Sequence, residues 1–144
     1  MDSVPFKCQI DTSNPACALG IEILIDDKSV YKNTHVNGPI DVSCDVVEDD
    51  AEHELKIVMF GKTPDHTIID DQENIVSDAM LSIKNITIDD IDINQLFIEK
   101  AMYKHDFNGS RPEIEDTFYG DMGCNGTISI KISTPVYLWL LENL

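Results

Sequence analysis

The stretch "VVEDDAEHELKIVMFGK" at residues 46–62 decides the fold class of this chain. Its second half alternates over 53–60, with Leu55, Ile57 and Met59 on one face of the segment. This period of two is typical of a half-buried strand. Acidic residues precede the run, and Asp favours turns because its carboxylate accepts hydrogen bonds from nearby backbone amides. We therefore predict a corner of a β-sandwich at the acids and a core-facing strand after them.

The residues before the corner continue the same period. In segment 39–47, Ile40, Val42, Cys44 and Val46 alternate with polar side chains, which indicates another half-buried strand. Two strands joined by a short acidic turn are most simply a β-hairpin. We therefore predict that these two strands pair directly with each other.

The corner also holds one of the densest groups of reactive side chains in the chain. This group is Glu48, Asp49, Asp50, Glu52 and His53. A calcium site is the functional alternative, because Ca²⁺ prefers several carboxylate and carbonyl oxygens from one loop. The spacing does not match the D-x-D-x-D-G pattern with a distal Glu, so we favour a turn that the histidine ring caps. We predict no cofactor and keep calcium as the alternative.

Alternation recurs along most of the chain. Further strands are predicted at 21–25, 29–31, 79–93 and 126–133. The sequence "DDK" between the first two suits a tight hairpin turn. A phase slip at Lys84–Asn85 indicates a bulge or a bend between two strands.

Only two segments have a helical alternative to a strand. Residues 135–144 begin with Pro and carry strong helix formers, which allows a short C-terminal helix, and a strand through 135–140 is the alternative. Residues 93–103 fit a helical turn and a strand equally well. Because strands do not alternate with helices, we predict an all-β fold, an antiparallel β-sandwich or jelly roll, in a single domain spanning 1–144.

Composition restricts the partners. Ten basic residues against 27 acidic ones give a formal net charge of −17. Such a surface repels phosphate backbones and anionic lipids, so we predict no direct nucleic-acid or membrane binding. No apolar run approaches the roughly 20 residues of a membrane helix.

The N-terminal residues have no basic segment followed by an apolar stretch, so we expect synthesis in a cytoplasm. Cysteines in a reducing compartment are mostly thiols. We therefore predict that Cys8, Cys17, Cys44 and Cys124 form neither disulfides nor a zinc site.

Two smaller groups of acids have structural interpretations. Residues 62–74 contain Asp65, His66 and the Asp70–Asp71 pair, which could bind a transition metal. No second histidine lies at a standard ligand spacing, so we favour a long hairpin with a turn at its second acidic group. The acids of 89–92 alternate, and we predict a solvated strand face that discourages edge pairing.

The segment 103–127 is long and carries several aromatic residues. Exposed aromatic rings beside polar groups suit stacking on sugars, so Tyr103, Phe107, Arg111 and Tyr119 are a candidate glycan-binding loop. Long loops on β-sandwiches often carry binding functions. The alternative is that the aromatics pin the loop onto the core.

The C-terminal segment offers a second kind of site. Tyr137, Trp139 and Leu141 could insert as anchors into a neighbouring protein. The alternative is that this segment closes the domain's own core. The chain contains no G-x-S-x-G elbow, P-loop or H-E-x-x-H motif, and we predict that it is not an enzyme.

Two resemblances add to this interpretation. The segment "GIEILIDDKSVYKN…GPIDVSCDVVEDDAEHELKIVM" resembles the strand and acidic-turn pattern of calcium-dependent xylan-binding-like modules and similar carbohydrate-binding sandwiches. The stretches "DDAEHELKIVMFGKTPDHT", "NIVSDAMLSIKNITIDDIDI", "HDFNG" and "MGCNGTISIKISTPVYLWLLENL" resemble small proteins of marine tailed phages, cyanophages in particular.

The second resemblance implies a virion-associated structural protein, made in a bacterial host cytoplasm. We expect a component of a tail, a fibre attachment or a capsid surface, present in multiple copies and acting through contacts with other virion proteins. The competing expectation is a carbohydrate-binding module, with calcium as its candidate cofactor, that recognises a host surface glycan.

Overall fold

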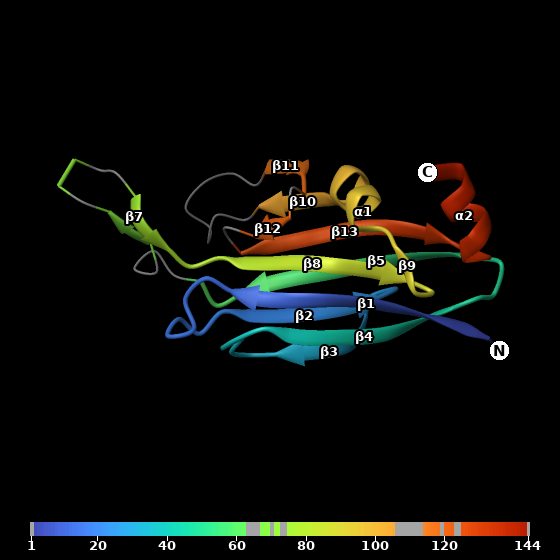
Figure 1. Cartoon of the computed structure of the whole chain (residues 1–144), viewed down its shortest axis with the longest axis horizontal. Helices are drawn as coiled ribbons and strands as arrows, with labels where there is room; N and C mark the ends of the chain where they lie inside the picture. Colours follow the sequence, from blue (N-terminus) through green and yellow to red (C-terminus); the bar gives the residue numbers. More distant parts are fainter. Residues whose placement is uncertain are drawn as a thin grey trace.

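The computed structural model describes residues 2–62, 67–69, 71–72, 75–105, 114–118, 120–122 and 125–143. Within these residues the chain forms two antiparallel sheets packed face to face, with two short helices at their margins (Figure 1). The elements are β1 (Ser3–Thr12), β2 (Gly20–Ile25), β3 (Lys28–Asn33), β4 (Ile40–Val47), β5 (Glu52–Phe60), β6 (Thr67–Ile69), β7 (Ile75–Asp78), β8 (Leu81–Ile88), β9 (Ile91–Asp92), α1 (Asn94–Lys100), β10 (Met102–His105), β11 (Ile114–Thr117), β12 (Asp121–Met122), β13 (Gly126–Ser133) and α2 (Val136–Asn143).

Each sheet combines strands from distant parts of the chain. The first, called the β1 sheet here, has the order β12–β8–β1–β4, with β9 beside β8. The second, the β5 sheet, has the order β11–β10–β13–β5–β2–β3. Strands β6 and β7 form a separate hairpin, which extends beyond the sandwich at the left of Figure 1. The predicted antiparallel β-sandwich is therefore confirmed.

The predicted hairpin at the acidic corner is wrong. Strand β4 pairs with β1, whereas β5 pairs with β2 and β13, so the corner crosses from one sheet to the other. Alternation shows where a strand runs and which face it buries, but not which neighbour supplies its hydrogen bonds. The prediction of a sandwich corner holds, and the direct pairing across it does not.

One central strand was absent from the prediction. Strand β1 pairs with both β4 and β8, and it buries Phe6, Cys8 and Ile10. The same period of two is present in its sequence, where Lys7 and Gln9 alternate with these apolar residues. The strand that organises the first sheet was therefore detectable from the residues.

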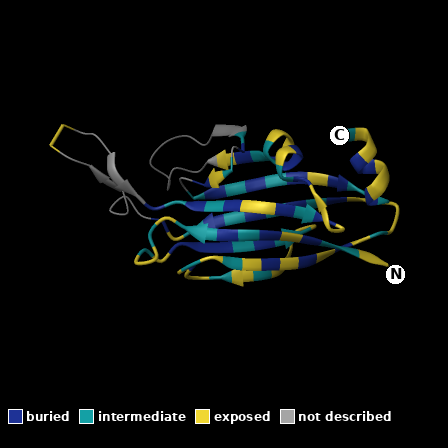
Figure 2. Ribbon diagram, viewed as in Figure 1, coloured by how far each residue is buried: buried dark blue, intermediate teal, exposed yellow. Residues whose placement is uncertain are grey.

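The core lies between the sheets, where buried and exposed residues alternate along the strands (Figure 2). On β5, Leu55, Ile57 and Met59 are each at most 1% exposed, as predicted. Helix α1 adds Phe97 to this core; its ring packs edge-on against Phe118 with centroids 5.8 Å apart. The sandwich therefore buries a continuous apolar layer, the main source of its stability.

Turns and a bulge explain two departures from simple strands. The Asp26–Asp27 pair between β2 and β3 has φ values of 52° and 65°, as expected for the predicted tight hairpin. The Asp89–Asp90 pair has φ values of 51° and 62° and also forms a turn, so the predicted strand is wrong at 89–90, whereas residues 91–92 form the exposed strand β9. Asn85 has a φ of 54° at a register shift in β8, which confirms the bulge.

Segments 93–103 and 135–144, for which the sequence allowed a helix or a strand, both contain a helix. The C-terminal segment forms α2, and residues 93–103 divide into α1 followed by β10. In the part of the chain that the structure describes, neither helix is long and apolar enough to cross a membrane. Cys8, Cys17 and Cys44 are free thiols, as predicted, and Cys124 lies outside the described residues.

Candidate functional site

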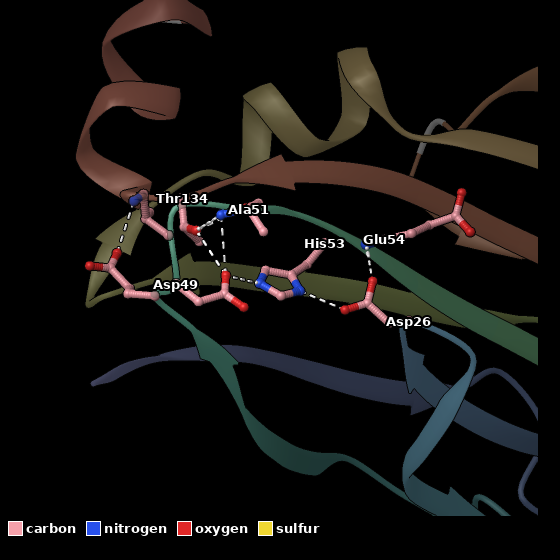
Figure 3. A network of polar contacts seen from close by, with 8 residues as sticks. Asp26, Asp49, Ala51, His53, Glu54 and Thr134 are labelled. Carbon is pink, nitrogen blue, oxygen red and sulfur yellow. Dashed lines mark hydrogen bonds and ion pairs between the residues drawn. The ribbon is translucent and has the colours of Figure 1, made fainter. Parts of the chain in front are cut away.

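His53 lies between two carboxylates at one end of the sandwich (Figure 3). Its Nδ1 is 2.5 Å from Asp26 Oδ2, and its Nε2 is 2.7 Å from Asp49 Oδ1. An ionised carboxylate only accepts hydrogen bonds, so both ring nitrogens donate. The ring is therefore a charged imidazolium, with only 11% of its side chain exposed.

Asp26, His53 and Asp49, called the trio here, each stabilise the charged form of the others. The hydrogen bond to Asp26 raises the pKa of His53 above its ordinary value, and the bond to Asp49 acts in the same direction. The hydrogen bonds from His53 in turn lower the pKa of both carboxyls. Opposite charges at this distance favour the ionised form of each group. The geometry thus favours two carboxylates about one imidazolium, because each group supports the charged form of its partners.

Asp26 connects the trio to the β2–β3 turn. Its Oδ1 accepts a hydrogen bond from the backbone nitrogen of Glu54 at 2.9 Å, and its own nitrogen donates to the carbonyl of Glu54 at 2.9 Å. The left-handed φ of Asp26 positions both groups toward β5. The turn is therefore held on the strand that carries His53.

Asp49 connects the trio to the end of β13. Its Oδ1 also lies 3.2 Å from the nitrogen of Ala51 and 3.4 Å from the hydroxyl of Thr134. That hydroxyl donates over the shorter distance of 2.8 Å to the carbonyl of Ala51. The corner, β5 and the end of β13 thus share one polar network.

The corner also holds the C-terminal helix. Glu48 Oε1 accepts a hydrogen bond from the backbone nitrogen of Val136 at 2.8 Å. Val136 is the first residue of α2, where backbone N–H groups lack partners within the helix and a negative charge is favourable. Acidic residues of the corner therefore cap a helix, through Glu48, as well as a turn, through Asp49.

This network does not fit catalysis or calcium. A histidine that activates a nucleophile has a carboxylate on one nitrogen and the nucleophile on the other, whereas His53 faces carboxylates on both. Both oxygens of Asp26 and the Oδ1 oxygen of Asp49 already accept hydrogen bonds in this network. Within the described residues, no group of three or more His, Cys, Asp or Glu side chains is placed to hold a metal.

The structure corrects one residue of the predicted glycan-binding loop. Tyr103 lies on β10 and is only 2% exposed, because its side chain faces the core between the sheets. Its burial agrees with the alternative that aromatics of this segment pin it to the core. Phe107, Arg111 and Tyr119 lie outside the described residues. Asp65, His66 and Asp70 of the other predicted loop also lie outside them.

The predicted docking residues divide into two groups. Tyr137 and Leu141 are 62% and 73% exposed on α2. Trp139 is only 6% exposed and points to the opposite side of the helix, into the core. Its assignment as a docking anchor is wrong, because it already anchors α2 to its own sandwich. Leu138, 45% exposed, lies on the outer side and was not predicted.

A further polar site was not predicted. A hollow of about 240 Å³ opens in the outer face of the β1 sheet, beside the bulge in β8. It is lined by Lys7, Cys8, Gln9, Asp41, Val42, Ser43, Asn85 and Thr87. The phase slip at Lys84–Asn85 was the sequence signal, but the other lining residues come from β1 and β4, whose positions beside it only the fold reveals.

Comparison with known proteins supports the architecture. The selenomethionine form of vCBM60, from work on circular permutation between two families of calcium-dependent carbohydrate binding modules, matches 88% of this chain and 89% of its own length, with a TM-score of 0.56 and 9% identity. The complex of vCBM60 with galactobiose matches 87% of this chain and 95% of its own, with a TM-score of 0.52 and 9% identity. No protein-family model matches the chain, and no curated protein matches its sequence. The likeness establishes the fold as a β-sandwich of the carbohydrate-binding-module type, as the first resemblance implied.

Proposed function

We propose that this chain is a carbohydrate-binding module, which holds a glycan without chemically changing it. The observation that carries the proposal is the similarity of the backbone, over 88% of the chain, to a module of this class. That neighbour was also determined with galactobiose. The polar hollow on the β1 sheet supplies convergent hydrogen-bonding side chains on the same scaffold, as a binding site requires.

The proposal assigns no calcium to the acidic corner. Calcium needs several oxygen ligands that are free to face the ion. Asp26 and Asp49 instead direct oxygens to His53, and Glu48 directs one to the backbone of α2. The imidazolium provides the positive charge that a cation would otherwise supply there.

A glycan array tests this function directly. The purified chain is applied in calcium buffer and in EGTA, and positive glycans, together with galactobiose and other neutral disaccharides, are measured by isothermal titration calorimetry. We expect saturable binding to a defined class of neutral glycan. A chain that is folded by circular dichroism but binds no glycan in either buffer contradicts the proposal.

A second candidate function is supported by α2. Tyr137, Leu138 and Leu141 form an exposed apolar face on this helix, and clustered exposed apolar residues are typical of protein interaction sites. The net charge of −17 opposes self-association through like charges. The corresponding partner is therefore a different protein with an apolar pocket and a basic rim.

This second function is that of a virion structural component, in line with the resemblance to marine phage proteins. It predicts that the chain is found in purified particles by mass spectrometry, in multiple copies beside other virion proteins. Leu141→Asp should prevent its incorporation. Val30→Asp, at a residue 42% exposed on β3, is the matched control and should be incorporated normally. Absence of the unmodified chain from particles contradicts this function.

A further inference from the structure

We propose that the hollow beside the β8 bulge binds a single neutral sugar ring of a glycan. This inference rests on the proposed carbohydrate-binding function and locates its site on the outer face of the β1 sheet. Two rows of outward-facing residues frame the hollow. The pairing of β1 with its neighbours aligns Ser43, Lys7 and Thr87 in one row, and Asp41 with Gln9 in the next.

The bulge creates the space between these rows. Lys7 pairs with Thr87 and Gln9 with Lys84, so β8 has one more residue than β1 in this interval. An extra residue bends its strand and interrupts the ladder, and Asn85 reaches the required left-handed φ of 54°. The hollow is therefore a consequence of the backbone at this position, formed before any ligand arrives.

Side chains at the bulge are positioned for a polar ligand. Asn85 Nδ2 donates to Gln9 Oε1 at 3.3 Å, which orients both amides. The amide nitrogen of Gln9 and the amide oxygen of Asn85 keep their hydrogen-bonding capacity. Asp41, Ser43 and Thr87 have no side-chain partner among the described residues. The hollow thus presents a donor amide, an acceptor amide, a carboxylate and two hydroxyls.

This mixture matches the hydroxyl groups of a sugar. Each sugar hydroxyl donates one hydrogen bond and accepts others, so neighbouring hydroxyls can satisfy donors and acceptors that lie side by side. Asp41 would accept from a hydroxyl in a charge-assisted bond, which is stronger than a neutral one. Ser43 and Thr87 can adjust by rotation of their own hydroxyls.

Other ligand classes fit less well. A phosphate or an acidic sugar would face Asp41 and a chain of net charge −17, while Lys7 is already paired with Asp90 at 3.3 Å. A divalent cation would find only one carboxylate in the lining. An aromatic ligand would find no aromatic ring to stack on there.

The dimensions favour one ring. Rows two residues apart along a strand are separated by about 7 Å, and three neighbouring strands span about 10 Å. The volume of about 240 Å³ is also smaller than that of sites for drug-sized ligands, which occupy roughly 300–1,000 Å³. A terminal sugar or one internal ring therefore fits, and an extended oligosaccharide would continue over the sheet.

The test combines mapping with matched variants. Amide chemical shifts are followed by NMR while the neutral disaccharides of the calorimetry panel are titrated into the whole chain. We expect the largest shifts along β1, β4 and the β8 bulge. Asp41→Asn should weaken binding at least about tenfold and Ser43→Ala roughly two- to tenfold, from the loss of one charged and one neutral hydrogen bond. Asp45→Asn is the control. Asp45 is exposed on the same strand but outside the hollow, so this substitution removes the same charge without changing the lining.

The outcomes separate the site from the function. The site is overturned if the unmodified chain binds sugar, if Asp41→Asn and Ser43→Ala each change the affinity by less than about twofold, and if the amide shifts lie elsewhere. In that case the carbohydrate-binding function still stands. A folded chain that binds no sugar overturns both. Thermal unfolding of each variant shows that it is folded, since all three substitutions are on the outer face of the sheet.

Discussion

His53 donates a hydrogen bond from Nε2 to Asp49 Oδ1 over 2.7 Å, and the two residues lie on the corner that carries the chain from one sheet to the other. The second ring nitrogen reaches the β2–β3 turn through Asp26. A single charged ring therefore joins a sheet crossing, a hairpin and, through Thr134, the approach to the C-terminal helix.

Replacement of His53 should destabilise the chain. His53→Ala removes a mostly buried ring and leaves Asp26 and Asp49 without their shared donor, so we expect a loss of roughly 1–3 kcal/mol in the free energy of unfolding. Urea denaturation measures it. His35→Ala is the matched control, because in the described structure that exposed ring forms a hydrogen bond with the carbonyl of Pro15 rather than with a carboxylate. Equal effects of the two substitutions would contradict the role assigned to His53.

The network should also make stability depend on pH in two directions. The pKa of His53 is raised in the folded chain, so its contribution is complete below the ordinary histidine value of about 6.5 and is lost as pH rises through the folded value. The pKa values of Asp26 and Asp49 are lowered, so their contribution is complete above about 4 and is lost as pH falls through the folded values.

Stability from the network is therefore predicted to be greatest between about pH 4 and 6.5. The melting temperature of the unmodified chain, measured from pH 3 to 9, is compared with that of His53→Ala. Subtracting one curve from the other removes the pH dependence that both proteins share, which comes from repulsion among the 27 acidic residues of the chain. A difference between the curves that does not change with pH would show that the ring is not charged in the folded chain.

Asp50 occupies a strained backbone position that glycine should relieve. Its φ of 60° lies in the left-handed region, and its side chain is exposed. Asp50→Gly should raise the free energy of unfolding by about 0.5–1 kcal/mol, because glycine adopts this conformation without a Cβ penalty. Asp45→Gly removes the same charge from an extended position in β4 and should instead lower stability. Thermal unfolding of the pair checks the sign of each effect.

Gly126 is required by close packing between β10 and β13. A Cβ at this position would lie 2.2 Å from the carbonyl oxygen of Lys104, a backbone atom that cannot move aside without disturbing the pairing. Gly126→Ala should lower the free energy of unfolding by about 1–3 kcal/mol. Gly38→Ala is the control, because nothing lies within 4 Å of the added methyl group. A stability of Gly126→Ala equal to that of the control would contradict this packing.

The buried cysteines should be unreactive in the folded chain. Burial raises the pKa of Cys8 to about 12 and that of Cys44 to about 11, and the thiolate is the reactive form. Iodoacetamide at pH 8 should therefore label Cys17, which is partly exposed, before these two. Peptide mass spectrometry quantifies the labelling, with denatured protein as the control for full reactivity. Rapid native labelling of Cys8 would contradict its placement in the core.

Much of the fold was predictable because local patterns specify it. Alternation identified β4, β5, β8 and β13 and the faces that they bury, because a strand with one buried face must repeat every second residue. Charged residues marked the corner, where backbone groups need polar partners. The helix formers and the preceding proline allowed the short C-terminal helix but did not exclude a strand there.

Pairing and site geometry depended on contacts between distant residues. The carboxylate partner of His53 at Asp26 comes from another turn, far away along the chain. The sequence left Tyr103 open between glycan binding and core packing, and Trp139 open between docking and core packing. The packing of their strand and helix turns both side chains into the core. Aromatic residues serve binding and burial equally well, so their type alone does not distinguish these roles.

By itself, the sequence determined the all-β class, the acidic surface and the faces of most strands, because these depend on residue type and on a period of two along a single segment. The tertiary structure decided that the acidic corner crosses between sheets, that its histidine lies between two carboxylates, and that a bulge opens a polar hollow across three strands. Each of these depends on hydrogen bonding and packing between segments whose separation along the chain is large, and such neighbours exist only after the sheets have formed.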